Sequence, residues 1–301
     1  MSALRWNAEA LWEQLEPLLP DLSVEVVARA ASTNTALLER ARVVGPPAGG
    51  DDQVLVRQSV ESGAFGRRAA DIQPCLLVAE QQTAGRGRNG RVWKSEAGAS
   101  LTFSLSLPMA VSDWSGLSLA VGVALAGALE PRPEPDSPRI ALKWPNDLWL
   151  MDGPLHGPGR KFGGILIETV MTGSTRLAVI GIGLNVRPLA IPIAGALPGS
   201  LQQIDPDADA PTVLARIARP LVLALKRFER EGFAPFAEGF DARDLLRGRD
   251  VCTTSPGALE GVAEGVSAQG ALLLQTAGGT RPVSSGEVSV RLGEPPPGLS
   301  C

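Results

Sequence analysis

Histidine and cysteine are scarce in this chain of 301 residues, and the shortage excludes several common kinds of site. The only histidine, His156, is followed by glycine and has no partner motif, so we assign it no role. The sequence shows no serine–histidine–aspartate or cysteine–histidine arrangement for nucleophilic catalysis, and it has no P-loop. The three cysteines are odd in number and lack metal-ligand spacing. We therefore expect no protein metal site, incidental thiols and a reducing compartment.

The chain also lacks a long apolar run and an excess of positive charge. Its longest apolar run, at residues 117–129, is too short to span a bilayer, and no basic, apolar leader precedes residue 19. The net charge is −4 and the pI about 5.3, which disfavours a general nucleic-acid binder. We expect a cytoplasmic protein with one large and one small domain and no membrane partner.

Lysine is rare too, because only four lysines stand against 24 arginines. Three of them, Lys94, Lys143 and Lys161, fall inside the motifs described below. Chance accounts for this with so few residues, but a need for a compact ammonium group at those positions accounts for it equally well.

The most informative segment is Gly85–Trp93, here called the arginine–glycine loop, in which three glycines and three arginines occupy six of seven consecutive positions. Glycine lets a backbone approach a ligand closely, and arginine offers a planar, permanently charged fork to phosphate or carboxylate. The composition predicts a loop that wraps an anionic small molecule.

The glycine spacing alone fits several kinds of protein. Gly85, Gly87 and Gly90 match the dinucleotide-binding pattern, but that pattern requires a helix next, whereas residues 101–107 alternate as a strand does. A protein kinase requires H-R-D and D-F-G motifs, which the sequence lacks. An RNA-coating segment usually repeats, and this one occurs once in an acidic chain.

Four further blocks accompany the loop, which is preceded by Gln81-Gln82-Thr83-Ala84. In order along the chain they are Ser32-Thr33-Asn34, Lys143-Trp144-Pro145-Asn146-Asp147, Lys161-Phe162-Gly163-Gly164-Ile165-Leu166-Ile167-Glu168 and Gly181-Ile182-Gly183-Leu184-Asn185. Together they resemble the signature motifs of the biotin protein ligase family over roughly residues 30–293.

The resemblance implies an α+β fold. We expect a biotin/lipoate ligase-like catalytic domain at residues 1–245, with a mixed, largely antiparallel sheet and flanking helices. A small SH3-like β-barrel is expected at 246–294 and a tail at 295–301. Periodicity predicts helices at 4–19, 35–41, 116–129, 212–231 and 233–241, and strands at 22–28, 53–58, 75–80, 101–107, 165–170 and 177–186. We assign no function to the extension at 45–73.

The resemblance also implies the reaction. Biotin is activated with ATP as biotinyl-5'-AMP, pyrophosphate leaves, and biotin passes to a lysine of a biotin carboxyl carrier protein or domain. Mg²⁺ is expected with ATP. Some relatives have an amino-terminal DNA-binding module. About 30 residues precede Ser32, too few for such a module, so we expect a monofunctional enzyme with no DNA partner. We also expect a monomer or weak homodimer.

Site residues follow from the matching positions. The catalytic candidates are Lys161, Arg88 and Asp147; Lys161 would bridge the biotin carboxylate and the α-phosphate, and Arg88 would retain the adenylate. The biotin-binding candidates are Ser32, Thr33, Asn34, Gln82, Gly85, Arg86, Gly87, Arg88, Lys161 and Gly164. The ATP-binding candidates are Arg88, Arg91, Trp93, Asn146, Lys161 and Asn185. Ser32 and Thr33 fit a helix cap equally well.

Two other functions stay open from the sequence. Lipoate or octanoyl transfer uses the same fold, but those relatives resemble only the lysine block and lack the arginine–glycine loop. A non-catalytic biotin sensor or repressor would require a DNA-binding module.

Overall fold

The computed structural model describes residues 4–42, 56–61, 72–134, 137–155, 157–189, 198–253, 259–284 and 290–292. The chain divides into two compact units, Met1–Ala110 with Arg160–Leu223 and Val111–Gly159 with Ala224–Cys301. The domain boundary predicted at residue 245 stays a prediction. His156 and most of the extension at 45–73 lie outside the described residues.

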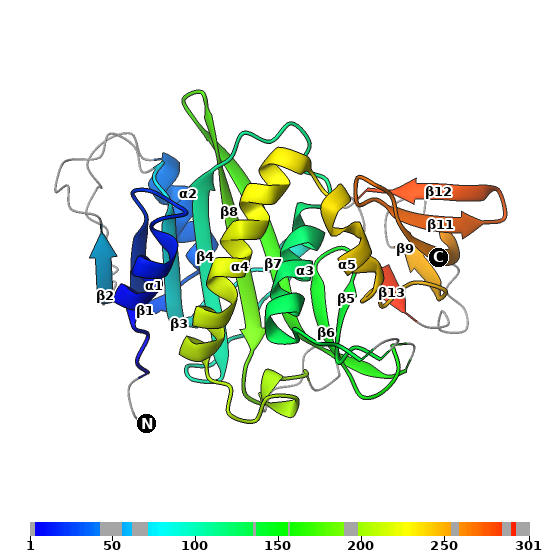
Figure 1. Cartoon of the computed structure of the whole chain (residues 1–301), viewed down its shortest axis with the longest axis horizontal. Helices are drawn as coiled ribbons and strands as arrows, with labels where there is room; N and C mark the ends of the chain where they lie inside the picture. Colours follow the sequence, from blue (N-terminus) through cyan, green and yellow to red (C-terminus); the bar gives the residue numbers. More distant parts are fainter. Residues whose placement is uncertain are drawn as a thin grey trace. The chain divides into compact units, whose positions relative to one another are not determined.

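The first unit is built on a mixed sheet, whose strands are coloured blue to green in Figure 1. Its strands are β1 (Ser23–Ala30), β2 (Val56–Glu61), β3 (Cys75–Gln82), β4 (Ser100–Pro108), β7 (Gly159–Thr172) and β8 (Thr175–Asn185). They lie in the order β2-β1-β3-β4-β8-β7. β1 and β3 are parallel and the other neighbours antiparallel, which confirms the predicted largely antiparallel sheet.

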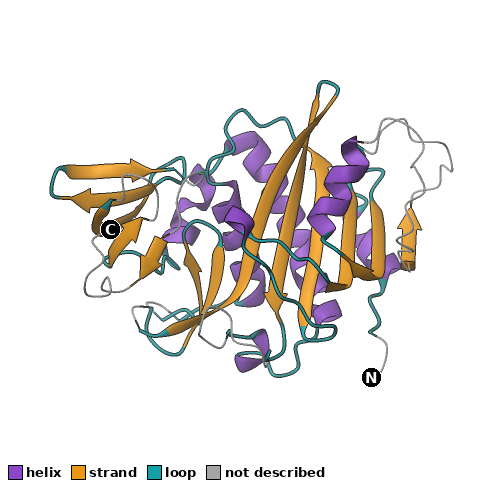
Figure 2. Ribbon diagram, turned by 180° about the vertical axis from the view of Figure 1, so that it is seen from behind, coloured by secondary structure: helices purple, strands orange, loops and turns teal. Residues whose placement is uncertain are grey.

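Helices cover both faces of this sheet. The helix α1 (Ala8–Leu15) packs on β1 and β2, and α2 (Thr33–Arg42) packs on β3, β4 and β8. Figure 1 shows α1 and the first half of α4 (Ala210–Glu231) in front of the strands, and in Figure 2, seen from behind, α2 lies on the opposite face. Apolar residues of α2 close a core against the sheet with the buried thiol of Cys75.

The strand β4 explains how this sheet carries a polar face inside the molecule. The sequence alternates from Ser100 to Leu107, a pattern typical of a strand with one solvated face. Every one of these residues is buried, because helices cover both faces. The leucines and Phe103 face one layer, and Thr102, Ser104 and Ser106 face the other, next to α2. Buried hydroxyls need partners, so this face is organised by hydrogen bonds.

The second unit holds the helices α3 (Leu117–Leu129) and α5 (Ala237–Asp241), the short helix η3 (Ala234–Phe236) and the hairpin strands β5 (Ile140–Lys143) and β6 (Asp147–Met151). A five-stranded antiparallel sheet follows the order β12-β11-β10-β9-β13. Its strands are β9 (Asp250–Thr253), β10 (Glu260–Val266), β11 (Leu272–Thr276), β12 (Gly279–Val283) and β13 (Val290–Leu292). The expected small β-domain is therefore present. The sequence predicts short strands here at 251–254, 259–266, 271–275 and 288–292. It does not predict the edge strand β12, because Pro282 argues against a strand except at an edge.

Two charged residues are buried side by side in the second unit. Arg243 donates to the Glu130 carboxylate and to the carbonyl of Ile140 at 2.8 Å, so its charge is compensated. Asp244 accepts the backbone N–H of Leu246 at 2.9 Å, and its Oδ2 has no partner among the described residues. Burial raises the pKa of Asp244 to about 6.

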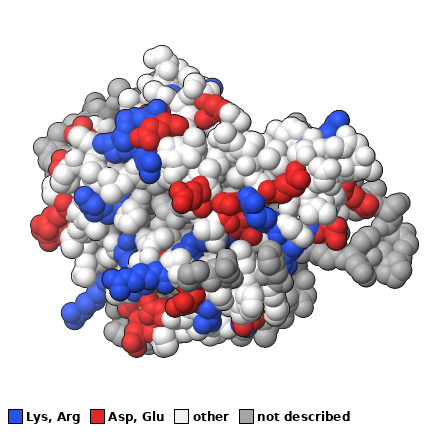
Figure 3. Space-filling model, turned by 45° about the vertical axis from the view of Figure 1, so that its right-hand side comes forward, with Lys and Arg blue, Asp and Glu red and all other residues white. Residues whose placement is uncertain are grey.

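Positive and negative side chains are interspersed on the face drawn in Figure 3, in keeping with the net charge of −4. Across the described part of the chain, no helix combines the length and apolar character needed to cross a bilayer.

Candidate functional site

A floor with little side-chain volume lies where β4, β8 and β7 run side by side in the first unit. Gly183 pairs with Gly164 on one side and Thr102 on the other, and Gly181 pairs with Leu166 and Ser104. Residues two apart on a strand face the same way, so these positions form one surface. Glycine inside a strand often marks the close approach of another group.

Two side chains already use this space. A Cβ on Gly181 would collide with Asn34 Oδ1, and a Cβ on Gly183 would lie 2.5 Å from Trp93 Cε2. A Cβ on Gly164 would lie 3.6 Å from the Trp93 ring and 3.5 Å from Lys161 Nζ. The two strand glycines therefore let α2 and the end of the arginine–glycine loop settle onto the sheet.

A hydrogen-bonded network joins α2 to the sheet at this floor. Ser104 Oγ lies 2.6 Å from both Thr33 Oγ1 and Asn34 Oδ1, and with one proton it donates to one of them at a time. Gln82 Oε1 accepts the backbone N–H of Thr33 at 2.8 Å and its hydroxyl at 3.2 Å. Ser32 Oγ accepts the backbone N–H of Thr35 at 3.3 Å, so the capping role considered for Ser32 is confirmed.

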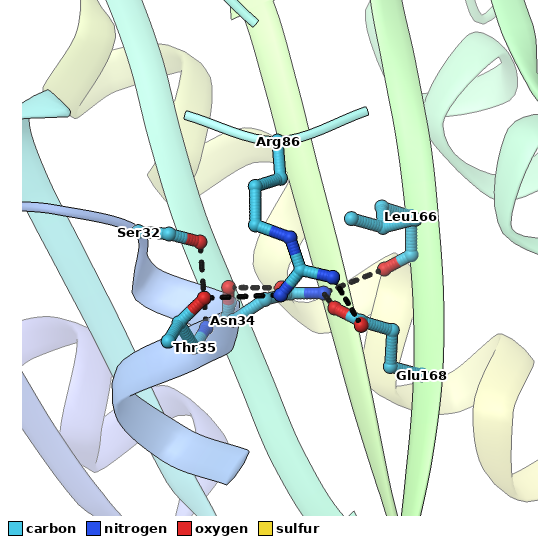
Figure 4. Close-up of polar contacts among 7 residues, drawn as sticks. Ser32, Asn34, Thr35, Arg86, Leu166 and Glu168 are labelled. Carbon is cyan, nitrogen blue, oxygen red and sulfur yellow. Dashed lines mark hydrogen bonds and ion pairs between the residues drawn. The ribbon is translucent and has the colours of Figure 1, made fainter. Parts of the chain in front are cut away.

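Asn34 is held from both ends of its amide. Its Nδ2 donates to the Leu166 carbonyl at 3.1 Å and to Glu168 Oε2 at 3.0 Å. Figure 4 shows these contacts converging between α2 and β7. Both amide hydrogens are thus used by the protein, so Asn34 shapes the site more than it offers donors to a ligand.

The arginine–glycine loop is folded as a tight ribbon. The backbone N–H of Trp93 donates to Gly85 O at 2.8 Å, and that of Gly87 donates to Arg91 O at 2.7 Å. A short turn, η1 (Arg88–Gly90), closes the ribbon with Asn89 in the left-handed region at φ 55°. A Cβ on Gly85 would collide with Trp93 O, so glycine is required where the two arms meet.

Arg86 ties this ribbon to the sheet. Its Nη1 donates to Thr35 Oγ1 at 3.1 Å and its Nη2 to Glu168 Oε1 at 2.9 Å. The sequence did not indicate this ion pair, and the biotin contact of Arg86 stays a prediction.

Lys161 and Asn185 are both hydrogen-bonded to the backbone of Gly199. Lys161 lies inside β7, which begins at Gly159 and not at Ile165 as predicted, because the glycines at 163 and 164 pair regularly with β8. The backbone N–H of Gly199 donates to Lys161 O at 2.9 Å, and Asn185 Nδ2 donates to Gly199 O at 3.2 Å.

Two polar atoms at the site are buried without a partner among the described residues: Trp93 Nε1, a donor, and Asn185 Oδ1, an acceptor. Leaving such a group unpaired costs about 1–3 kcal/mol each. A polar ligand that reached both atoms would remove that cost.

The first unit contains every predicted site residue except Asn146 and Asp147. These two lie in the second unit, at the turn of the β5–β6 hairpin, where Asp147 pairs with Lys143 and the Trp144–Pro145 bond is cis. Their roles stay predictions. In the described ranges no group of three or more histidine, cysteine, aspartate or glutamate side chains could hold a metal ion.

Sequence reasoning missed Ser104 and Glu168 as members of the site. A signal for Ser104 was available, because Thr102, Ser104 and Ser106 put three hydroxyls on one face of a predicted strand. Glu168 closes the lysine block, but its partner Arg86 lies 82 residues away, and no local pattern links them.

Comparison with known proteins gives matches along most of the chain. Residues 71–185 match the model described as the biotin/lipoate A/B protein ligase family, and residues 251–291 match the biotin protein ligase C terminal domain. The bifunctional ligase/repressor BirA of Escherichia coli is 34% identical over 265 residues, covering 86% of this chain and 79% of that protein. The biotin–[acetyl-CoA-carboxylase] ligase of Mycobacterium tuberculosis is 31% identical over 281 residues, covering 88% of each.

A solved structure supports the same grouping. The biotin protein ligase from Aquifex aeolicus, in complex with biotin and ATP, superimposes with a TM-score of 0.66 at 26% identity. The match covers 90% of this chain and 99% of that one.

Proposed function

The chain belongs to the biotin protein ligase family, and we propose that the glycine floor and the arginine–glycine loop of its first unit are where it activates biotin. The chain is an ATP-dependent biotin protein ligase that forms biotinyl-5'-AMP and then transfers biotin to protein. The observation that supports this location is the convergence of Ser32–Asn34, Gln82, the loop and Lys161 on the strand glycines.

The polar network suits the head group of biotin. A cyclic urea presents two N–H donors and one carbonyl acceptor, and it requires both kinds of partner in a buried site. The hydroxyls of Thr33 and Ser104 and the amide of Gln82 supply both. Ser32 and Asn34 hold these groups in place, and Gly85, Gly87 and Gly164 are proposed to contact the ligand through their backbone.

Lys161 is proposed to bring the two reacting anions together. At about 4 Å and an effective dielectric of about 20, a carboxylate and a phosphate oxygen repel by about 4 kcal/mol. The ammonium of Lys161, a partly buried residue beside Gly164, would offset this repulsion. A biotin carboxylate oxygen then attacks the α-phosphorus of ATP, the bond to the β-phosphate bridging oxygen breaks, and pyrophosphate leaves.

The nucleotide is proposed to lie against Trp93 and Asn185. The buried Trp93 Nε1 and Asn185 Oδ1 have no hydrogen-bond partner among the described residues. Arg88 and Arg91 would hold the phosphates and keep the adenylate from water. Asn146 is proposed as a further ATP-binding residue. Mg²⁺ would arrive with ATP, since the described residues offer no cluster of their own for it.

The acceptor is a biotin carboxyl carrier. Its lysine amine attacks the acyl carbon of biotinyl-5'-AMP, AMP leaves, and Asp147 is proposed to orient the amine. We further propose that the chain acts as a monomer or weak homodimer and does not bind DNA. A gel-shift assay with the upstream region of biotin genes tests the last point.

The test of the function is to mix the protein with ATP and either biotin or lipoate, then to add a carrier domain. Biotin-dependent pyrophosphate release followed by labelling of one carrier lysine is expected. Pyrophosphate release that depends on lipoate and not on biotin would favour lipoate ligation. If neither acid caused pyrophosphate release, the proposal would be overturned.

A further inference from the structure

Both terminal nitrogens of Arg86 are engaged, and their partners lie on two separate elements. Nη1 donates to Thr35 Oγ1 on α2, and Nη2 donates to Glu168 Oε1 on β7. The ion pair is partly exposed, with 48% of the Arg86 side chain and 23% of the Glu168 side chain accessible. The guanidinium is a rigid fork of donors, so one side chain can bond to both elements at once.

The contact spans the floor. The loop leaves the end of β3, and Glu168 lies on β7, with β4 and β8 between them. Three strand spacings of about 4.8 Å separate β3 from β7. Arg86 therefore holds the ribbon across the strand that carries Gly181 and Gly183, on the face covered by α2.

Glu168 serves the loop and the floor at once. One carboxylate oxygen accepts from Arg86 and the other accepts from Asn34 Nδ2 at 3.0 Å, as Figure 4 shows. Asn34 Oδ1 in turn lies 2.6 Å from Ser104 Oγ. A single carboxylate thus couples the closed position of the loop to the orientation of the amide that sits over Gly181.

We propose that Glu168, with Thr35, is a positioning residue that latches the arginine–glycine loop closed through Arg86. When the latch opens, the ribbon is released from β7 and α2, and the floor is exposed to solvent. The second half of this inference rests on the proposed function: an enzyme that stores a hydrolysable adenylate on this floor depends on the latch to retain it.

Limited trypsin digestion tests the latch without any ligand, because Arg88 and Arg91 are cleavage sites inside the ribbon. Proteolysis of a segment that opens and recloses quickly follows the population of its open form. Partly exposed ion pairs change such a population by about twofold to fivefold. Glu168→Gln is therefore expected to speed cleavage after Arg88 and Arg91 by about that factor, read by mass spectrometry.

A matched control is available in the same unit. Glu25 of β1 pairs with Arg40 of α2 at 2.9 Å, the same distance as in the latch, and both residues lie outside the loop. Glu25→Gln should leave cleavage in the loop at the wild-type rate. Arg86→Gln should match Glu168→Gln, and the double variant should be no faster than either. Thr35→Val should give a smaller increase, which separates loss of the latch from misfolding.

The functional half is read from the lifetime of bound biotinyl-5'-AMP in single-turnover experiments. Glu168→Gln should shorten it by about the same factor as the trypsin result, and Glu25→Gln should not. Unchanged cleavage in Glu168→Gln, or additive effects in the double variant, would overturn the latch. Faster cleavage with an unchanged lifetime would overturn its role in retention. A wild-type protein that forms no adenylate would overturn the proposed function, while the cleavage data would still decide the latch.

Discussion

Gly183→Ala is the most direct test of the contact between the strand glycines and the loop. The added Cβ would lie 2.5 Å from Trp93 Cε2 and 2.7 Å from Cζ2 and Nε1. Carbon atoms in favourable contact are about 3.5–4.0 Å apart, so the indole has to move by about 1 Å. The ring is rigid, and the floor beneath it is β-sheet backbone, so the displacement cannot be absorbed by a flexible chain end.

The expected cost follows from that overlap. Forcing an extra methyl group into a packed site costs about 1–3 kcal/mol. For a unit of this size, each kcal/mol lowers the melting temperature by about 2–4 °C. A 1 Å misplacement at a reacting centre costs up to about 100-fold in rate, so biotin-dependent pyrophosphate release should fall more steeply than stability.

Thermal unfolding and pyrophosphate-release kinetics measure the two effects. Gly127→Ala in α3 is the control, because its Cβ would meet nothing within 4 Å and alanine favours a helix. Trp93→Phe in the Gly183→Ala background should recover part of the lost stability, since the smaller ring relieves the overlap. If Gly183→Ala melted and reacted like Gly127→Ala, the placement of Trp93 on the floor would be wrong.

Three further outcomes are expected. Lys161→Ala should lower the adenylation rate about 100- to 1000-fold with little change in melting temperature, and wild-type rates of biotinyl-5'-AMP formation would remove Lys161 from the mechanism. Ser104→Ala should destabilise the protein by about 1–3 kcal/mol and raise the KM for biotin, because Thr33 and Asn34 lose a buried partner; an unchanged KM would leave Ser104 a purely structural role. The pKa of Asp244 is about 6 in the folded state against 3.8 in the unfolded state, so between these pH values the folded state holds a proton on Asp244 that the unfolded state has lost. The free energy of unfolding of the wild type therefore falls as the pH rises from 3.8 to about 6, by on the order of 3 kcal/mol at most. Asp244→Asn should therefore gain stability relative to wild type between pH 5 and pH 7.5 in denaturant unfolding, and a difference independent of pH would contradict the assignment.

Local patterns predicted the elements that local forces decide. The apolar spacing from residue 212 to 231 places α4 within two residues of its observed start, and the alternation at 101–107 identifies β4. The loop was predicted from its composition, because the backbone freedom of glycine and the charged fork of arginine are properties of the residues themselves and do not depend on distant contacts. The expectation of a strand at 53–58 overlaps β2 only in part, and residues 51–55 lie outside the described ranges.

The parts that escaped prediction depend on contacts between distant segments. Alternation cannot tell a solvated polar face from one covered by α2, so the burial of Ser104 was not foreseen. The start of β7 was placed six residues late, because Gly163 and Gly164 are weak strand formers that only pairing with β8 holds extended. The pairing of Arg86 with Glu168 depends on the strand order, which a single sequence does not reveal.

A crystal structure of the protein with bound biotinyl-5'-AMP tests the central claim most directly. The account predicts the ligand on the face of Gly181 and Gly183, with Lys161 Nζ within about 4 Å of its acyl phosphate and Arg86 still on Glu168. A ligand bound away from these glycines, with the Lys161 ammonium turned from the acyl phosphate, would contradict it.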